Sequence, residues 1–381
     1  MYQKAEMKNI MVKHMAFMAG ERQVYMDHQF QAKDRNNIWS IAMDGADQSA
    51  HDIPKVMGRV PKDLMSSTWP QKLQCVVAHG DLLAMFSVLP LVLCGGNMAL
   101  TCLLRIFQLL AAAGCGCPKK LYLQVDGGSE NWCIALFAVL DLLFDLYPDL
   151  DEIVVSRLGV GHTHIDIDRF FSYLNALLFG TSAGGSHSGA SVLCPTDFEA
   201  LFNTAMKSKK DTKKLDHVYE QLNFTYDWKG FLGDHFYKGF TGYGSAGAVH
   251  VMKYHRQTPY PAPPHVSYKY WHQSPKWLPA DGSSLRILST RPDLRDLNEL
   301  KVCAFIDDHA AVVTKLKMPT MKWVSSQVPY GLVKESHVAD WKAFFDAIPK
   351  TPTATFGANF PDNRRFNTDK VLIYIDIYRY I

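Results

Sequence analysis

The chain is 381 residues long, with 48% hydrophobic and 20% charged residues. This composition excludes a disordered chain, a coiled coil and a collagen-like protein, and the length predicts two to three domains or one large domain with an appendage. Forty basic residues nearly balance 37 acidic residues, for a net charge of +3. The chain as a whole therefore lacks the basic charge of a dedicated nucleic-acid-binding domain, and such a partner would have to contact a local patch.

Cysteine usage and hydropathy indicate the cellular compartment. Most of the eight cysteines lie inside apolar runs, as small buried side chains do, and they do not form a disulfide scaffold. The first 14 residues have scattered charges and no apolar core, unlike a signal peptide. The uncharged stretch 82–104 is long enough to cross a bilayer, but proline and glycine interrupt it, and a buried strand feeding a buried helix is the better interpretation. We expect a nuclear or cytoplasmic protein that is neither secreted nor in a membrane.

Hydrophobic periodicity, taken in chain order, predicts an α/β protein. The expected elements are a helical lead-in at 1–35, strands at 38–43, 73–80 and 82–89, a helix at 97–113, a strand at 120–128, a helix at 131–146, a strand at 151–161, a helix at 164–179, and a helix that a capping box at 196–199 opens. Three strands joined by short turns favour an antiparallel meander, and the alternation that follows favours parallel strands with crossover helices. We therefore predict a ribonuclease H-like mixed sheet with flanking helices over 36–215.

The character of the sequence changes after residue 215. Tyr, Trp, Pro and Gly become more frequent and helical periodicity fades. Residues 250–277 and 370–381 have the pattern of strands and extended loops. We expect 216–381 to form a β-rich C-terminal region that follows the core.

Acidic residues follow two predicted strands and open one predicted helix. Asp44 ends the first strand, Asp126 ends the fourth, and Asp166 and Asp168 open the helix after the fifth. Such strand ends can converge on one edge of a mixed sheet, where gathered carboxylates need a cation. Oxygen ligands select Mg²⁺ or Mn²⁺, and two such ions can support phosphodiester cleavage. Ordinary turn chemistry after a strand, or dipole complementation at a helix start, is the structural alternative for each residue.

The densest polar motif is GHTHIDID at 161–168. On a helix, His162 would lie beside Asp166 and His164 beside Asp168, and the helical wheel leaves open which aspartate faces the sheet edge. The motif is also similar to the HxHxDH pattern of metallo-β-lactamase-like hydrolases, although Ile167 stands where that pattern has its last histidine. A zinc-dependent hydrolase is therefore an alternative function.

Four blocks of the sequence resemble one eukaryotic domain family of unknown function that is thought to be transposase-derived. They are WSIAMDGADQ at 39–48, VVAHG at 76–80, LQVDGGSEN at 123–131 and GVGHTHIDIDRFFS at 159–172, within a similarity that spans roughly 14–280. The matching residues are Asp44, Asp47, Gln48, Asp126, Glu130, Asn131, Gly161, His162, Thr163 and Asp168. Gly127 departs from the family pattern, which usually has Asn after the second aspartate.

The resemblance implies an integrase or transposase core of the ribonuclease H-like class acting on DNA. Its catalytic and metal-binding residues would be Asp44, Asp126 and Asp168, with Mg²⁺ or Mn²⁺ as a two-ion cofactor. Supporting roles would fall to Asp166, His162, His164, Glu130, Asn131 and Asp47. No zinc-finger or helix-turn-helix pattern precedes residue 36, so we expect either a fragment or a copy that no longer moves DNA. A catalytically inactive nucleic-acid-binding or structural derivative of the same fold is the main alternative.

One dense basic run, KSKKDTKK at 207–214, is a candidate contact for DNA phosphates. The candidate side chains are Lys207, Lys209, Lys210, Lys213 and Lys214. A solvated loop is the alternative for this run. Aromatic and basic residues interleaved over 250–277 could stack on unpaired bases or form a β-rich core. We expect structural roles for His79, His235 and His250, and a homo-oligomer is left open.

Overall fold

A single mixed sheet organises the computed structural model, which describes residues 2–34, 37–46, 51–56, 63–158, 166–179, 191–208, 216–241, 243, 249–258, 262–295 and 297–361. Within them the strand order is β6-β3-β2-β1-β4-β5-β7-β8. The strands are β1 (Ile38–Gly45), β2 (Lys72–Ala78), β3 (Leu82–Val88), β4 (Lys120–Val125), β5 (Glu152–Arg157), β6 (Asp216–Leu222), β7 (Val251–His255) and β8 (His265–Lys269).

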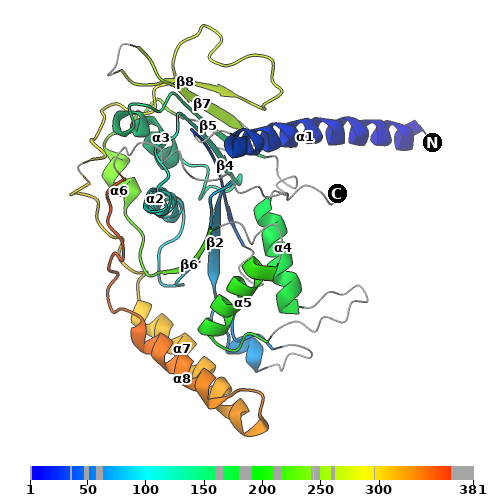
Figure 1. Ribbon diagram of the computed structural model, residues 1–381, viewed down its shortest axis with the longest axis vertical. Coiled ribbons are helices and arrows are strands. Elements are labelled where there is room, and N and C mark those ends of the chain that lie inside the picture. Colours follow the sequence, from blue (N-terminus) through cyan, green and yellow to red (C-terminus); the bar gives the residue numbers. More distant parts are fainter. Residues whose placement is uncertain are drawn as a thin grey trace.

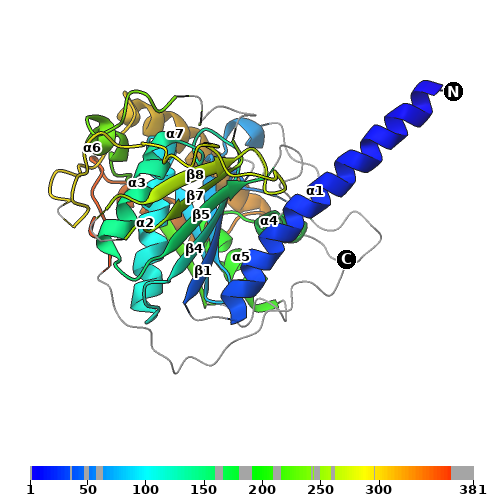
Figure 2. The same ribbon diagram turned by 90° about the horizontal axis from the view of Figure 1, so that it is seen from above.

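Helices cover both faces of the sheet (Figure 1). They are α1 (Tyr2–Asp34), α2 (Gly96–Ala112), α3 (Ile134–Leu146), α4 (Asp166–Phe179), α5 (Pro195–Ser208), α6 (Trp228–Gly233), α7 (His309–Gln327) and α8 (Glu335–Ala347). Figure 1 shows α2 and α3 on one face and α4 and α5 on the other. Figure 2 shows that α1 crosses the sheet with its C-terminal part, while its N-terminal part projects away from the body.

Strand directions confirm the predicted mixed α/β plan. β1, β2 and β3 form an antiparallel meander, whereas β4 and β5 run parallel to β1. The connections from β3 to β4 and from β4 to β5 contain α2 and α3, as is typical of crossovers between parallel strands of one sheet. β1 therefore lies in the interior of the sheet, between β2 and β4.

The burial of the central strands and helices explains why the sequence predicts them. Every residue of β3 is buried, as in a strand that helices cover on both sides, so the strand is a continuous apolar run. The uncharged stretch 82–104 forms β3 and the first half of α2. In the part of the chain that the structure describes, no helix combines the length and the apolar character that crossing a membrane requires.

The expectation of a β-rich region over 216–381 was wrong in two respects. β6, β7 and β8 join the same sheet as β1 to β5, and α7 and α8 occupy much of 309–347. α7 buries only Thr320, Trp323 and Val324 and contains Pro319. Its apolar periodicity is weak for that reason, and the helix was not predicted. The predicted strand at 370–381 lies outside the described residues.

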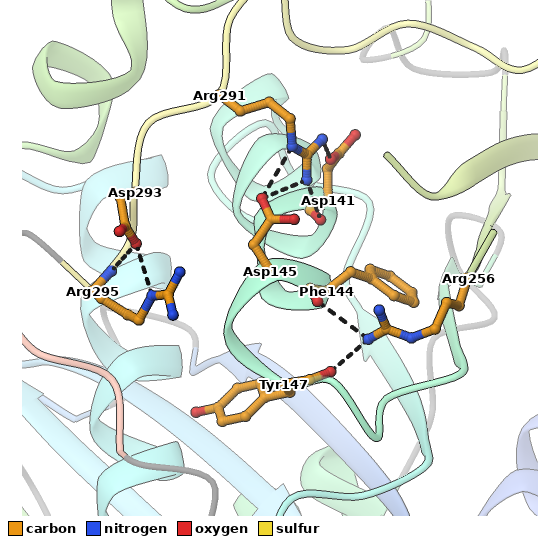
Figure 3. Close-up of polar contacts among 8 residues, drawn as sticks. All are labelled: Asp141, Phe144, Asp145, Tyr147, Arg256, Arg291, Asp293 and Arg295. Atoms are coloured by element: carbon orange, nitrogen blue, oxygen red, sulfur yellow. Dashed lines mark hydrogen bonds and ion pairs between the residues drawn. The ribbon is translucent and has the colours of Figure 1, made fainter. Parts of the chain in front are cut away.

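Arginines tie the irregular segments after β7 and β8 to α3 (Figure 3). Arg291 donates to Asp145 Oδ2 at 2.9 and 3.0 Å and forms an ion pair with Asp141. Burial raises the pKa of Asp141 to about 6, although the positive charge of Arg291 acts to lower it. Arg256 donates to the carbonyl oxygens of Phe144, at 3.2 Å, and Tyr147, at 2.6 Å, at the C-terminal end of α3, where carbonyl groups lack partners within the helix.

We expect Arg291→Ala to lower the free energy of unfolding by about 2–3 kcal/mol at neutral pH, because it leaves the Asp141 carboxylate buried without its cation. Arg295→Ala is the matched control, since Arg295 pairs with Asp293 in solvent and such pairs contribute less than about 1 kcal/mol. Urea unfolding of the three proteins measures both values. Equal losses in the two variants would contradict a structural role for the buried pair.

Candidate functional site

Two parallel strands bring the first two predicted aspartates to the same edge of the sheet. Met43 of β1 lies opposite Val125 of β4 in the register, so Asp44 and Asp126 occupy equivalent positions at the carboxyl ends. α4, which begins at Asp166, packs against β1 and β2. The strand ends and the first turn of α4 thus enclose one region of the sheet edge.

Asp44 is the carboxylate of this region with the largest pKa shift. Its residue is 8% exposed, and the Gly45 N–H donates to Oδ1 at 2.8 Å. Burial, together with the negative charges of Asp126 and Asp168, raises the pKa of Asp44 to about 7. Asp126 and Asp168 are therefore close enough to disfavour the ionisation of Asp44, which is the effect expected of acidic groups that share a site.

Local hydrogen bonds orient Asp126. Its Oδ1 accepts from the Gly128 N–H at 3.2 Å and from Asn131 Nδ2 at 2.6 Å. The first contact is an Asx turn, which explains the Asp-Gly-Gly sequence after β4. Asn131 is buried, and its Oδ1 has no hydrogen-bond partner among the described residues. Asn131 therefore positions Asp126 and leaves one buried acceptor oxygen beside it.

The structure separates the roles of Asp166 and Asp168. Asp166 accepts hydrogen bonds from the Tyr25 hydroxyl and from Gln29 Nε2, both on α1, and lies 2.8 Å from His79 Nε2. Burial raises the pKa of Asp166, but the charge and hydrogen bond of His79 outweigh it and lower the pKa to about 2. Asp166 therefore joins α1, the sheet and α4, while Asp168 is the residue whose charge acts on Asp44.

The other predicted supporting residues have different fates. Glu130 forms an ion pair with Lys72 at 2.8 Å, at the start of β2. Lys207 lies in the last turn of α5. The remaining predicted residues lie outside the described part of the chain, namely Asp47, Gln48, Gly161, His162, Thr163, His164, Lys209, Lys210, Lys213 and Lys214.

The three histidines expected to be structural contact protein groups. His79 Nδ1 lies 2.8 Å from the Ser40 carbonyl oxygen, in addition to the contact of Nε2 with Asp166. His235 Nδ1 lies 2.7 Å from Thr290 Oγ1, and the ring of His250 stacks on Trp271 with centroids 3.6 Å apart.

One charged residue beside the acidic edge was not predicted. Arg157 is the last residue of β5, opposite Val125, and is 3% exposed. Its guanidinium lies over the Trp132 ring, 5.0 Å from the centroid, and its Nε donates to the Val249 carbonyl oxygen at 2.9 Å. A Cβ at position 127 would lie 3.9 Å from Nη1 of Arg157. The sequence signal that could have identified Arg157 is a charged residue at the end of a buried strand.

Ligand-atom spacing singles out a second cluster. In the described part of the chain, one group of three potential metal ligands has all its ligand atoms within 4.8 Å of one another, and it consists of Cys194, Asp197 and His337. Asp126 and Asp168 act electrostatically on Asp44, but the carboxylate oxygens of these three residues do not all lie within 4.8 Å of one another.

These features define a mixed α/β protein with an acidic group at the carboxyl edge of its parallel strands. Residues 63–271 match the family described as a domain of unknown function (DUF7869). Because the match covers more than half of the chain, the protein belongs to this family. The matched region contains Asp126 and Asp168 but neither β1 nor Asp44. No curated protein and no solved structure gives a significant match.

Proposed function

We propose that the protein is a transposase- or integrase-derived enzyme that cleaves or transfers phosphodiester bonds of DNA with divalent metal ions. The observation that carries the proposal is the effect of the Asp126 and Asp168 charges on buried Asp44, which brings together the end of β1, the turn after β4 and the first turn of α4. The antiparallel meander continued by parallel strands with crossover helices supports a ribonuclease H-like core. A DNA substrate would favour the nucleus as the site of action.

The donor set fits the proposed metal. Carboxylate and amide oxygens are the ligands that Mg²⁺ and Mn²⁺ prefer, and Asn131 Oδ1 is a buried oxygen without a partner among the described residues. The pKa of Asp44, raised to about 7 by burial and by its acidic neighbours, reflects a charge excess that a divalent cation would offset. Asp44, Asp126 and Asp168 would hold the ions.

Bound ions would activate the attacking water and offset negative charge on the phosphate. The residues of this chain would supply the positioning. The Gly45 N–H orients Asp44, and Asn131 together with the Gly128 N–H orients Asp126. Arg157, next to the turn after β4, would place a fixed positive charge near the phosphate that these residues receive.

A catalytically inactive derivative is the second candidate. It is favoured by the ligand spacing, because the three aspartates do not form a group with all oxygens within 4.8 Å. It is also favoured by the engagement of Glu130 with Lys72. This candidate predicts salt-dependent DNA binding, with Lys207 and its basic neighbours as contacts, and no turnover. The zinc-hydrolase alternative depends on His162 and His164, outside the described residues.

Cleavage of labelled DNA under Mg²⁺ or Mn²⁺ titration tests the proposal. We expect metal-dependent cleavage that falls more than about 100-fold in Asp126→Ala, and about 10- to 100-fold in Asn131→Ala, as is typical for an outer-shell partner. Asp151→Ala, at an exposed position before β5, is the control that should keep full activity. Metal-dependent cleavage that survives Asp126→Ala would refute the assignment, and DNA binding without any turnover would favour the inactive derivative.

A further inference from the structure

A second set of polar side chains lies far along the chain from the acidic edge, where α5 meets α8. Cys194 immediately precedes α5, Asp197 lies in its first turn, and His337 lies in the first turn of α8. Their ligand atoms lie within 4.8 Å of one another, and His337 Nε2 is 3.9 Å from Asp197 Oδ2. Three side chains of metal-binding type, from two helices, therefore point to one place.

Asp340 lies beside this group of three, outside its 4.8 Å spacing, and is a candidate fourth ligand. It follows His337 by three positions on α8, and its Oδ2 accepts from Thr196 Oγ1 at 3.0 Å. The same hydroxyl lies 3.3 Å from Cys194 Sγ. The two helices thus contribute the patterns Cys-x-x-Asp and His-x-x-Asp, which resemble the paired short spacings of structural zinc sites.

Packing and hydrogen bonds hold the start of α5 and the start of α8 together independently of a metal ion. Trp341, buried and next to Asp340, donates through Nε1 to the carbonyl oxygen of Leu193, next to Cys194, at 2.6 Å. Asp197 Oδ2 accepts from the Leu193 N–H at 2.8 Å. Both ligand-bearing turns are therefore fixed relative to each other by contacts that do not involve the proposed ligand atoms of Cys194 and His337.

We propose that Cys194, Asp197, His337 and Asp340 form a structural zinc site that clips α8 to the start of α5. A thiolate, an imidazole nitrogen and carboxylates form the mixed donor set that Zn²⁺ accepts, whereas Mg²⁺ and Ca²⁺ require oxygen donors. Four protein ligands leave no open position for a substrate, which is typical of a structural rather than a catalytic site. The inference does not depend on the proposed DNA cleavage.

Zinc binding has a defined proton balance. The Cys194 thiol releases its proton to solvent when the sulfur becomes a ligand. His337 Nδ1 accepts from the Lys334 N–H at 3.2 Å, so the neutral ring carries its proton on Nε2, the nitrogen that faces Asp197. Coordination through Nε2 requires that proton to move to Nδ1, and the hydrogen bond from Lys334 is lost in exchange for the metal bond.

Metal analysis and cobalt substitution of the full chain test the site. We expect about one zinc per chain after purification in zinc-supplemented medium. In the chelator-treated protein, Co²⁺ should produce a thiolate-to-cobalt charge-transfer absorption, which Cys194→Ser should abolish. His337→Gln should weaken cobalt binding by more than about 10-fold. Cys303→Ser and His309→Gln are the matched controls, because they remove the same side-chain types elsewhere and should keep both zinc and the absorption band.

The test stays decisive if Cys194→Ser does not fold, because His337→Gln and one further variant, Asp340→Asn, also address the site. Asp340→Asn and His337→Gln change partly exposed side chains and should lower cobalt affinity while the fold persists. Asp126→Ala should leave zinc content unchanged, which separates this site from the acidic edge. Absence of zinc together with absence of the cobalt–thiolate band would overturn the proposal. So would zinc that is retained in Cys194→Ser and lost in His162→Ala, a result that would instead support the zinc-hydrolase alternative.

Discussion

Asp44→Asn is expected to stabilise the metal-free protein by about 2 kcal/mol at pH 8 and to abolish cleavage. Burial and the acidic neighbours raise the pKa of Asp44 to about 7, against about 3.9 in an unfolded chain. Between these values the folded protein holds a proton that the unfolded chain has lost, so this group reduces stability as pH rises from about 4 to 7. Asparagine removes the charge and can still accept from the Gly45 N–H.

Unfolding by urea with a chelator present, at pH 5 and pH 8, measures this effect. The stability difference between Asp44→Asn and the wild type should grow over that interval, while Asp151→Asn, at an exposed position, should show no such growth. Added Mg²⁺ should stabilise the wild type and not the Asp44 variant, because only a binding-competent folded state gains from the ligand. A difference that stays constant with pH would contradict the shifted pKa.

Substitutions of the two aspartates at the start of α4 should have opposite consequences. We expect Asp166→Ala to lower the free energy of unfolding by about 3–5 kcal/mol, because it leaves His79, Gln29 and Tyr25 without a partner that they share in the interior. We expect Asp168→Asn to change stability by less than about 1 kcal/mol and to eliminate cleavage. The structural role and the catalytic role would thus fall to two residues in the same first turn of α4.

Thermal or urea unfolding together with the DNA cleavage assay distinguishes the two residues. The contribution of Asp166 should be complete above pH 4 and lost as pH falls toward 2, since the ion pair with His79 lowers its pKa to about 2. Asp166→Asn should therefore flatten the acid limb of the stability curve. Cleavage that persists in Asp168→Asn, or destabilisation equal to that of Asp166→Ala, would show that the assignment of the two roles is wrong.

The central strands and helices could be predicted because their apolar residues face the core at regular spacing. The choice between Asp166 and Asp168 could not, since its determinants, Tyr25 and Gln29, lie 141 and 137 residues away. A helical wheel relates only the residues of one helix, so it cannot show contacts of α4 with α1. The α5–α8 cluster was missed for a related reason: Cys194 and His337 belong to different helices, and each alone has the appearance of an ordinary residue near a helix start.

The position of β1 has a practical consequence for work on this family. β1 separates β2 from β4 in the sheet, yet it precedes the region 63–271 that defines the family match. A fragment cut at those limits would split the sheet into two parts, and the edges of β2 and β4 would each expose a row of unpaired backbone groups, which promotes aggregation. Expression trials should therefore include Ile38–Gly45 from the outset, together with the α1 residues that bind Asp166.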